Sequence, residues 1–124
     1  MHFPLRNVFV SVVIPCLNEQ EPIGGVVREV LAQGVDEVVV VDNGSTDRTA
    51  EEAAAAGARV VREPRRGYGR ACAAGLAALE ARSEIVCFLD GDGSDVPTFM
   101  REVTGPLAAD RADFVIGSRV RGKR

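Results

Sequence analysis

The chain has 124 residues, 46% of them hydrophobic and 27% charged, with a formal net charge of -3. This composition is typical of one globular domain, and the net acidic charge argues against a general nucleic-acid-binding protein, which is usually basic. Because no apolar run approaches the ~20 residues of a membrane span and no signal sequence begins the chain, we expect a cytoplasmic protein.

Apolar runs of strand length alternate with helical patterns along the chain. The first run covers residues 8–14, and Pro15 is expected to end it. Apolar residues then recur at helical spacing through residues 23–31, which predicts a helix with one buried face. A second strand is predicted at residues 37–41, ending at Asp42.

The alternation continues after the second strand. Ser45 or Thr46 is expected to cap a second helix that runs through the alanines at 53–56. A short third strand is predicted at residues 59–62. The apolar spacing over residues 72–79 predicts a third helix.

The last part of the chain repeats the pattern once more. A fourth strand is predicted at residues 85–89, and Pro97 suits the first turn of a fourth helix. Residues 114–116 form a fifth predicted strand. Fully apolar strands that alternate with helices predict an α/β fold, a Rossmann-like parallel sheet of about five strands with helices on both faces. We expect a single domain over residues 1–124.

Polar residues follow four of the predicted strands. Right-handed crossovers place the carboxyl ends of parallel strands at one edge of a sheet, and ligands bind at that edge. The polar runs expected there are Asn18-Glu19, Asp42-Asn43-Gly44-Ser45, Asp90-Gly91-Asp92 and Ser118-Arg119. Three of these runs carry carboxylates, so the sequence predicts one shared ligand site.

Asp90 and Asp92 are the candidate metal ligands. In an extended segment, residues two apart point to the same side, so both carboxylates can address one cation. Hard oxygen ligands suit Mg²⁺ or Mn²⁺. An acidic turn after a strand is the alternative, but the position directly after a buried strand favours the cation site.

Asp42 and the loop before the third helix have two interpretations each. Asp42 can accept hydrogen bonds from a ribose or a base, or it can be a turn residue. The run Arg65-Arg66-Gly67-Tyr68-Gly69-Arg70 favours an anion, because it combines glycines and cations with a helix N-terminus. For any one of these arginines, including Arg70, a solvated loop is equally consistent.

No nucleophile system can be assembled from this sequence. His2 is the only histidine and has no assigned role, so Ser–His and Cys–His pairs are excluded. The three cysteines, Cys16, Cys72 and Cys87, form no CxxC pair and are expected to be buried thiols. We expect Cys16 to be packed rather than reactive.

Taken together, these motifs resemble the family-2 glycosyltransferases with a GT-A fold, in particular the dolichyl- or polyprenyl-phosphate sugar synthases. The matching runs occur in family order and cover nearly the whole chain. They are Val13-Ile14-Pro15-Cys16-Leu17-Asn18-Glu19, Val41-Asp42-Asn43-Gly44-Ser45-Thr46-Asp47, Gly67-Tyr68-Gly69-Arg70-Ala71, Phe88-Leu89-Asp90-Gly91-Asp92 and Gly117-Ser118-Arg119.

The resemblance implies a GDP- or UDP-linked sugar donor and a Mg²⁺ or Mn²⁺ cofactor held by Asp90 and Asp92. The implied donor-binding residues, with Arg70 added from the anion-favouring loop, are Pro15, Leu17, Glu19, Asp42, Arg70, Asp90 and Arg119. Within this set, the first three would line the nucleoside pocket and the last would lie near the phosphates or the acceptor. Asn43 stands where the family more usually has an aspartate.

The resemblance also implies transfer with inversion. A complete catalytic domain of this family is longer than this chain, so we expect the C-terminal acceptor part to be absent, and no general base is assignable. A polyprenyl phosphate at the membrane surface is the favoured acceptor, because it is already ionised and needs no base. The alternatives are a nucleotide-sugar-binding module without transfer activity and, last, a nucleotidyltransferase.

A sheet without its usual flanking elements leaves an exposed edge or apolar face, and such surfaces tend to pair. We therefore expect a homo-oligomer, most simply a two-fold dimer.

Overall fold

The computed structural model describes residues 8–92 and, as backbone only, residues 113–116. Strands and helices alternate in these ranges. In chain order they are β1 (Val10–Cys16), α1 (Ile23–Ala32), β2 (Glu37–Asp42), α2 (Thr49–Ala55), β3 (Arg59–Arg62), α3 (Tyr68–Ala77), β4 (Ile85–Phe88) and β5 (Asp113–Ile116). The predicted fourth helix after Pro97 and the predicted site residue Arg119 lie outside the described residues.

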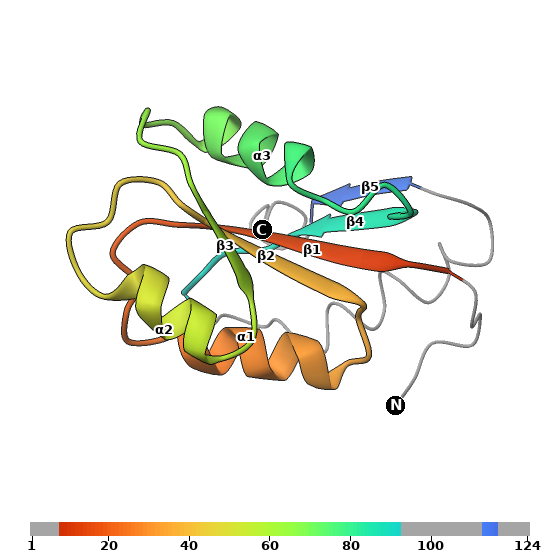
Figure 1. Cartoon of the computed structure of the whole chain (residues 1–124), viewed down its shortest axis with the longest axis horizontal. Helices are drawn as coiled ribbons and strands as arrows, with labels where there is room; N and C mark the ends of the chain where they lie inside the picture. Colours follow the sequence, from red (N-terminus) through yellow and green to blue (C-terminus); the bar gives the residue numbers. More distant parts are fainter. Residues whose placement is uncertain (1–7, 93–112, 117–124) are drawn as a thin grey trace, which may run out of the picture.

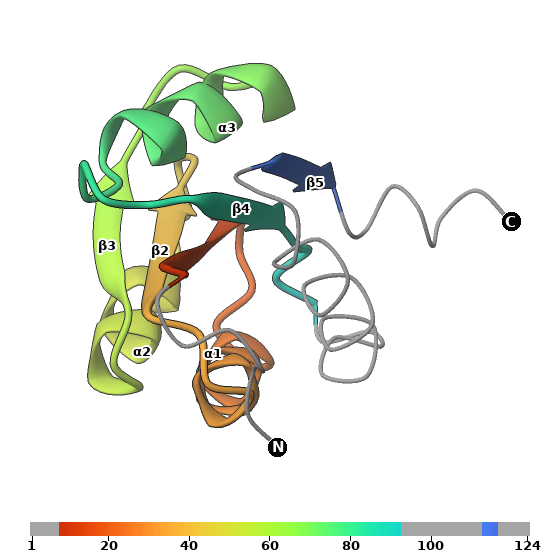
Figure 2. The same cartoon turned by 90° about the vertical axis from the view of Figure 1, so that its right-hand side faces the viewer.

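The described strands form one parallel sheet, as the sequence predicted, and their order is β3-β2-β1-β4-β5. Figure 1 shows α1 and α2 on one face of the sheet and α3 on the other, and Figure 2 shows the same layers after a quarter turn. The chain moves outward from β1 to β3 and then returns to the other side of β1 through α3. The carboxyl ends of β1 and β4 therefore lie where the winding direction reverses, the usual place for a ligand crevice in such sheets.

β1 does not end at Pro15, as the sequence suggested, but continues through it to Cys16. In a parallel ladder the N–H and C=O of one residue point to the same neighbouring strand, and successive residues alternate between neighbours. Because the carbonyl of Val13 accepts from Leu89 N at 3.0 Å, Pro15 also faces the β4 side. Its missing N–H ends the pairing with β4 at Val13–Phe88, while the pairing with β2 continues to Cys16–Asp42.

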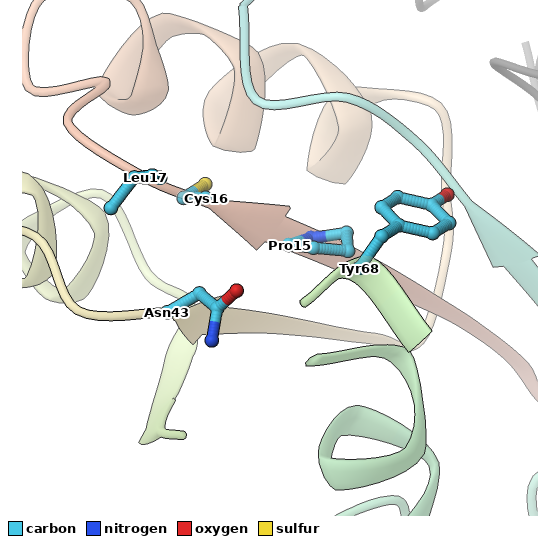
Figure 3. A pocket seen from close by; sticks show the side chains of 5 residues that line it. All are labelled: Pro15, Cys16, Leu17, Asn43 and Tyr68. Carbon is cyan, nitrogen blue, oxygen red and sulfur yellow. The ribbon is translucent and has the colours of Figure 1, made fainter. Parts of the chain in front are cut away.

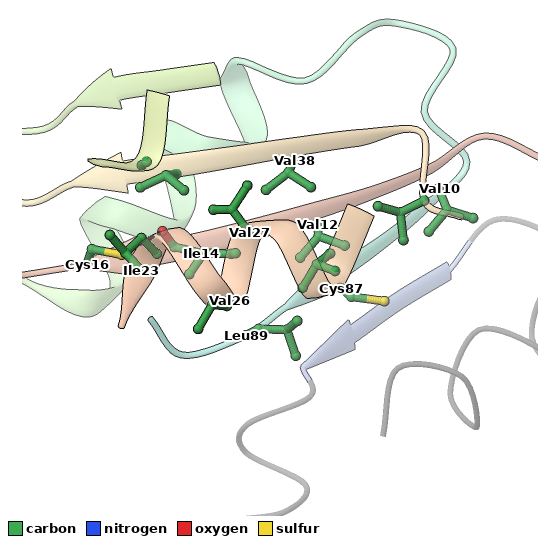
Figure 4. Packing of buried hydrophobic residues seen from close by; sticks show 14 of the residues in the cluster. Val10, Val12, Ile14, Cys16, Ile23, Val26, Val27, Val38, Cys87 and Leu89 are labelled. Atoms are coloured by element: carbon green, nitrogen blue, oxygen red, sulfur yellow. Dashed lines mark hydrogen bonds between the residues drawn. The ribbon is translucent and has the colours of Figure 1, made fainter. Parts of the chain in front are cut away.

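The core has one layer on each face of the sheet. The larger layer, under α1 and α2, is shown in Figure 4, and the smaller layer lies under α3. β2 is buried along its whole length, which explains its continuous run of valines. α1 buries the predicted face, although Leu31 at its end is only partly buried.

The start of α2 differs from the prediction. The helix begins at Thr49, after Arg48, and neither Ser45 nor Thr46 caps it. Instead, the Oδ1 atom of Asp47 accepts a hydrogen bond from the backbone N–H of Thr49 at 2.9 Å. The loop before α2 is therefore longer than predicted, and the hydroxyl groups of Ser45 and Thr46 bond to Asn18 in a neighbouring loop rather than to the helix.

Within the described ranges, no helix is long and apolar enough to cross a membrane.

Candidate functional site

The predicted site residues gather where β1, β2 and β4 end. Leu17 and Glu19 follow β1, Asp42 closes β2, and Asp90 and Asp92 follow β4. Since β2 and β4 are the two neighbours of β1, these side chains converge on one edge of the sheet. The structure therefore brings Leu17, Glu19, Asp42, Asp90 and Asp92 to one edge of the sheet.

The Asp90–Asp92 segment packs directly on the end of β1. Gly91 between the two aspartates is buried, and a Cβ at that position would lie 2.5 Å from Cys16 Sγ and 3.5 Å from Glu19 Cγ. Only a glycine leaves room for this approach. Glu19 therefore lies beside the two aspartates, although it is far from them in sequence.

The carboxylates interact with one another through their charges. Partial burial raises the pKa of Glu19, and the negative charges of Asp92, Asp90 and Asp47 raise it further. Asp90 is half-buried and Asp92 is exposed. A divalent cation would relieve this like-charge crowding, and oxygen ligands of this kind suit Mg²⁺ or Mn²⁺.

Within residues 8–92, no three His, Cys, Asp or Glu side chains form a complete metal-binding group. The residues present fit a cation that one or two carboxylates hold and whose other ligands come from water and substrate phosphates, which is a common mode for Mg²⁺. Asp90 and Asp92 as metal ligands stay a prediction.

A pocket of about 180 Å³ lies at the end of β1, at the same strand-end edge of the sheet. Its lining residues, shown in Figure 3, are Pro15, Cys16, Leu17, Asn43 and Tyr68. The sequence predicted Pro15 and Leu17 for this role but missed Tyr68, the first residue of α3. The only tyrosine of the chain stands between two glycines at a helix start, and that was the available signal.

Cys16 lines this pocket but is not a nucleophile. Burial raises the pKa of its thiol to about 12, and the nearby carboxylates of Glu19 and Asp42 raise it as well. Because the thiolate is the reactive form, the thiol stays protonated and unreactive near neutral pH. The expectation that Cys16 is packed is confirmed, since 3% of its surface is exposed.

Asp42 is almost fully buried, with 2% of its surface exposed. Its Oδ1 atom accepts from the backbone N–H of Ser45 at 2.9 Å, and its Oδ2 atom accepts from Arg62 Nη1 at 3.0 Å. Asp42 therefore has the turn role that the sequence left open. A further contact with a ribose or base stays a prediction.

Asn43 joins the end of β2 to the loop that leads to α3. Its amide nitrogen donates to the backbone carbonyls of Glu63 at 2.7 Å and Arg65 at 2.9 Å, and its Oδ1 atom accepts from Gly67 N at 3.2 Å. An aspartate cannot donate the first two bonds. Asn43 thus fixes the backbone just before Tyr68, which sequence reasoning did not anticipate.

The arginines before α3 have different surroundings. Arg65 is bonded to Glu63, with Nε 2.9 Å from Oε2, and this pairing lowers the pKa of Glu63 to about 2. The guanidinium of Arg66 lies beside Gly44, because a Cβ there would be 3.4 Å from Arg66 Nε. Arg70 is exposed in the first turn of α3, and its predicted phosphate contact stays a prediction.

Comparison with known proteins connects this arrangement with sugar transfer. Residues 11–124 match the family model described as glycosyl transferase family 2. An uncharacterized glycosyltransferase of Mycobacterium tuberculosis is 45% identical over 114 residues, which cover 89% of this chain and 48% of that protein. A glucosyl-3-phosphoglycerate synthase of Mycolicibacterium smegmatis is 44% identical over 110 residues, covering 79% of this chain and 36% of that protein.

A solved structure shares the fold. The M. tuberculosis glucosyl-3-phosphoglycerate synthase, in complex with Mn²⁺, UDP-glucose and phosphoglyceric acid, superposes with a TM-score of 0.71 at 37% identity. The match covers 83% of this chain and 40% of that one. The chain therefore has the α/β fold of these glycosyltransferases, and it spans less than half the length of each of these three relatives.

Proposed function

Because this chain belongs to glycosyltransferase family 2, we propose that it binds a nucleoside-diphosphate sugar together with a divalent cation and takes part in transfer of the sugar. One observation carries this proposal. The pocket at Pro15, Leu17 and Tyr68 lies at the same strand-end edge as Asp90 and Asp92, and Gly91 between the two aspartates lies against the side chain of Cys16. A small pocket and paired carboxylates at one strand-end edge suit a ligand with a flat base at one end and a diphosphate at the other.

The pocket suits one part of such a donor. Sites that enclose a whole drug-sized ligand measure roughly 300–1,000 Å³, so a cavity of about 180 Å³ holds a smaller group. We assign the base to this pocket and the diphosphate to the cation held by Asp90 and Asp92. A UDP-linked donor is the first choice, because the solved relative binds UDP-glucose with Mn²⁺, and a GDP-linked donor is the second.

In this proposal, the residues of the chain would have the following roles. Asp90 and Asp92 hold the cation, which would neutralise charge on the departing nucleoside diphosphate. Tyr68 and Leu17 hold the base, while Asn43 fixes the backbone that leads to Tyr68. The acceptor attacks the anomeric carbon with inversion, and the chain offers no assigned general base within residues 8–92.

For the acceptor, the relatives change the order of preference. The sequence favoured polyprenyl phosphate, whereas two of the three relatives are named for synthesis of glucosyl-3-phosphoglycerate. We therefore propose 3-phosphoglycerate first and polyprenyl phosphate second. Both acceptors carry an anionic phosphate.

Calorimetry tests donor binding. We expect UDP-glucose to bind with Mn²⁺ and much more weakly without it, and Asp92→Ala to remove the Mn²⁺-dependent part. Glu21→Gln, at an exposed position on the loop after β1, controls for the loss of one negative charge. If Asp92→Ala leaves Mn²⁺-dependent binding unchanged, the metal assignment is wrong.

Product analysis then tests transfer. The chain is incubated with UDP-glucose and Mn²⁺, in one arm with 3-phosphoglycerate and in the other with a polyprenyl phosphate. Donor binding without product in either arm favours the alternative of a binding module. Release of pyrophosphate from a nucleoside triphosphate instead favours a nucleotidyltransferase.

A further inference from the structure

Residues 18–20 of the loop between β1 and α1 are hydrogen-bonded to residues 45–49, which lead from β2 into the start of α2. The backbone N–H groups of residues 18, 19 and 20 each donate to a side chain across the gap. The acceptors, in that order, are Ser45 Oγ at 2.8 Å, Thr49 Oγ1 at 2.8 Å and Asp47 Oδ2 at 3.3 Å. Three consecutive donors outside regular structure are thus satisfied by one neighbouring segment.

Residues 46 and 48 in turn donate hydrogen bonds to the side chains of residues 18 and 20. The Oδ1 atom of Asn18 accepts from Thr46 N at 2.9 Å and from Thr46 Oγ1 at 3.4 Å. The Oε1 atom of Gln20 accepts from Arg48 N at 2.9 Å. We call these six reciprocal hydrogen bonds the loop clasp.

Asn18 is the central residue of the loop clasp. It has a left-handed backbone with φ of 56°, a conformation that asparagine tolerates better than most residues. The residue is exposed, so core packing does not fix it. It takes part in three of the six bonds, and we attribute its placement to them.

The loop clasp connects residues of the proposed donor site. Leu17, on one side of Asn18, lines the pocket, and Glu19, on the other side, lies against Gly91. Ser45, which accepts from Asn18 N, donates its own backbone N–H to Asp42. The ends of β1 and β2 are therefore tied together through Asn18.

We propose that Asn18 is a positioning residue of the donor site, which holds Leu17 and Glu19 in place through the loop clasp. This inference rests on the proposed function. It assigns no contact between Asn18 and the donor. The loop clasp gives Ser45 and Thr46, which follow β2, a role other than capping α2.

The test compares two substitutions at one position. Asn18→Gly keeps the left-handed backbone without strain but removes both bonds accepted by the side chain. Asn18→Asp keeps an acceptor oxygen in the same place. We expect Asn18→Gly to weaken UDP binding in the presence of Mn²⁺ about tenfold, and Asn18→Asp to restore it to within about threefold.

A matched control separates positioning from stability. At the amino-terminal ends of β1 and β2, Asp36 Oδ2 accepts a hydrogen bond from Val10 N at 2.8 Å, again between a side chain and a backbone N–H. We expect Asp36→Ala to lower the melting temperature and leave the Kd for UDP unchanged. If Asn18→Gly does not fold, Ser45→Ala removes a clasp bond from the other loop and is expected to weaken UDP binding in the same way.

The outcomes are distinguishable. If the wild type binds UDP with Mn²⁺ and Asn18→Gly binds it within twofold of the wild type, the positioning role is overturned and the proposed function stands. The role is also overturned if Asp36→Ala weakens UDP binding as much as Asn18→Gly. A wild type that binds no UDP with Mn²⁺ overturns both.

Discussion

Gly75 of α3 lies directly on Val13 of β1. A Cβ at Gly75 would overlap Val13 Cγ1 and would lie 3.1 Å from Val41 Cγ2. Both valines are fully buried, so neither can move aside. This contact sets how closely α3, with Tyr68 at its first turn, approaches the sheet.

We therefore expect Gly75→Ala to lower the free energy of unfolding by about 1–3 kcal/mol, because it overpacks a filled core. Urea unfolding followed by circular dichroism measures the change. Gly69→Ala in the same helix is the matched control, since a Cβ there meets nothing within 4 Å. That control should be neutral or stabilising by up to about 1 kcal/mol. Equal effects of the two substitutions would contradict the packing argument.

Gly91 offers a second steric test, aimed at the metal site. We expect Gly91→Ala to displace the Asp90–Asp92 segment, because its Cβ would lie 2.5 Å from Cys16 Sγ, and so to weaken Mn²⁺-dependent UDP binding. Adding Cys16→Ala removes the sulfur atom and is expected to restore much of that binding. Calorimetry of both variants measures this, and no recovery in the double variant would show that the contact is not responsible.

Tyr68 tests the base assignment. It lines the pocket with Pro15, and 42% of its surface is exposed. Stacking between a base and an aromatic ring contributes roughly 1–3 kcal/mol, so we expect Tyr68→Ala to weaken UDP binding about tenfold or more. Tyr68→Phe keeps the ring and should bind UDP nearly as the wild type does. If both variants lose affinity equally, the hydroxyl group matters rather than the ring.

The lowered pKa of Glu63 predicts that the stability of the fold depends on pH. Hydrogen bonds from the side chain and backbone of Arg65 lower the pKa of Glu63 from 4.5 to about 2. Since the folded state then binds fewer protons than the unfolded state, the stabilisation is complete above about pH 4.5 and is lost as the pH falls towards 2. Glu63→Gln should have a lower melting temperature at pH 7, and its difference from the wild type should shrink over that range. A difference that stays constant from pH 7 to pH 2 would contradict this assignment.

The homo-oligomer predicted from the sequence also stays a prediction, and light scattering at micromolar concentration tests it. β3 lies at one edge of the described sheet, is four residues long and has an exposed arginine at each end. Short, charged edge strands discourage pairing, so we expect a dimer to use a surface other than this edge. A monomer at that concentration would contradict the prediction.

The layout of the fold was predictable because it depends on local patterns. Uninterrupted valines mark β2 as a strand buried on both faces, and the spacing from Ile23 to Val30 marks α1 as half-buried. Parallel connection then places Glu19, Asp42 and Asp90 at one edge without any coordinates. Pro15 and Leu17, which the family resemblance assigned to the nucleoside pocket, do line a pocket at the end of β1, and their contact with a nucleoside stays a prediction.

The remaining features depend on partners far apart in sequence. Pro15 is compatible with a strand only because its missing N–H faces the side where β4 diverges, and the sequence does not reveal that side. Ser45 and Thr46 are typical capping residues, but their partner is Asn18 in another loop. Tyr68 reaches the pocket because Asn43 fixes the backbone before it. Such pairings follow from tertiary contact and have no short-range signature.

The loop clasp has a consequence for how this site can diversify. The bonds that hold the segment after β1 use the backbone N–H of Glu19 and the side chains of its neighbours, while the side chain of Leu17 contributes none of them. The proposed donor-binding side chains at positions 17 and 19 can therefore be replaced without removing these hydrogen bonds. Because the backbone is held independently of these two side chains, single replacements can change donor selectivity. Positions 17 and 19 are therefore the first to randomise when a different donor is sought.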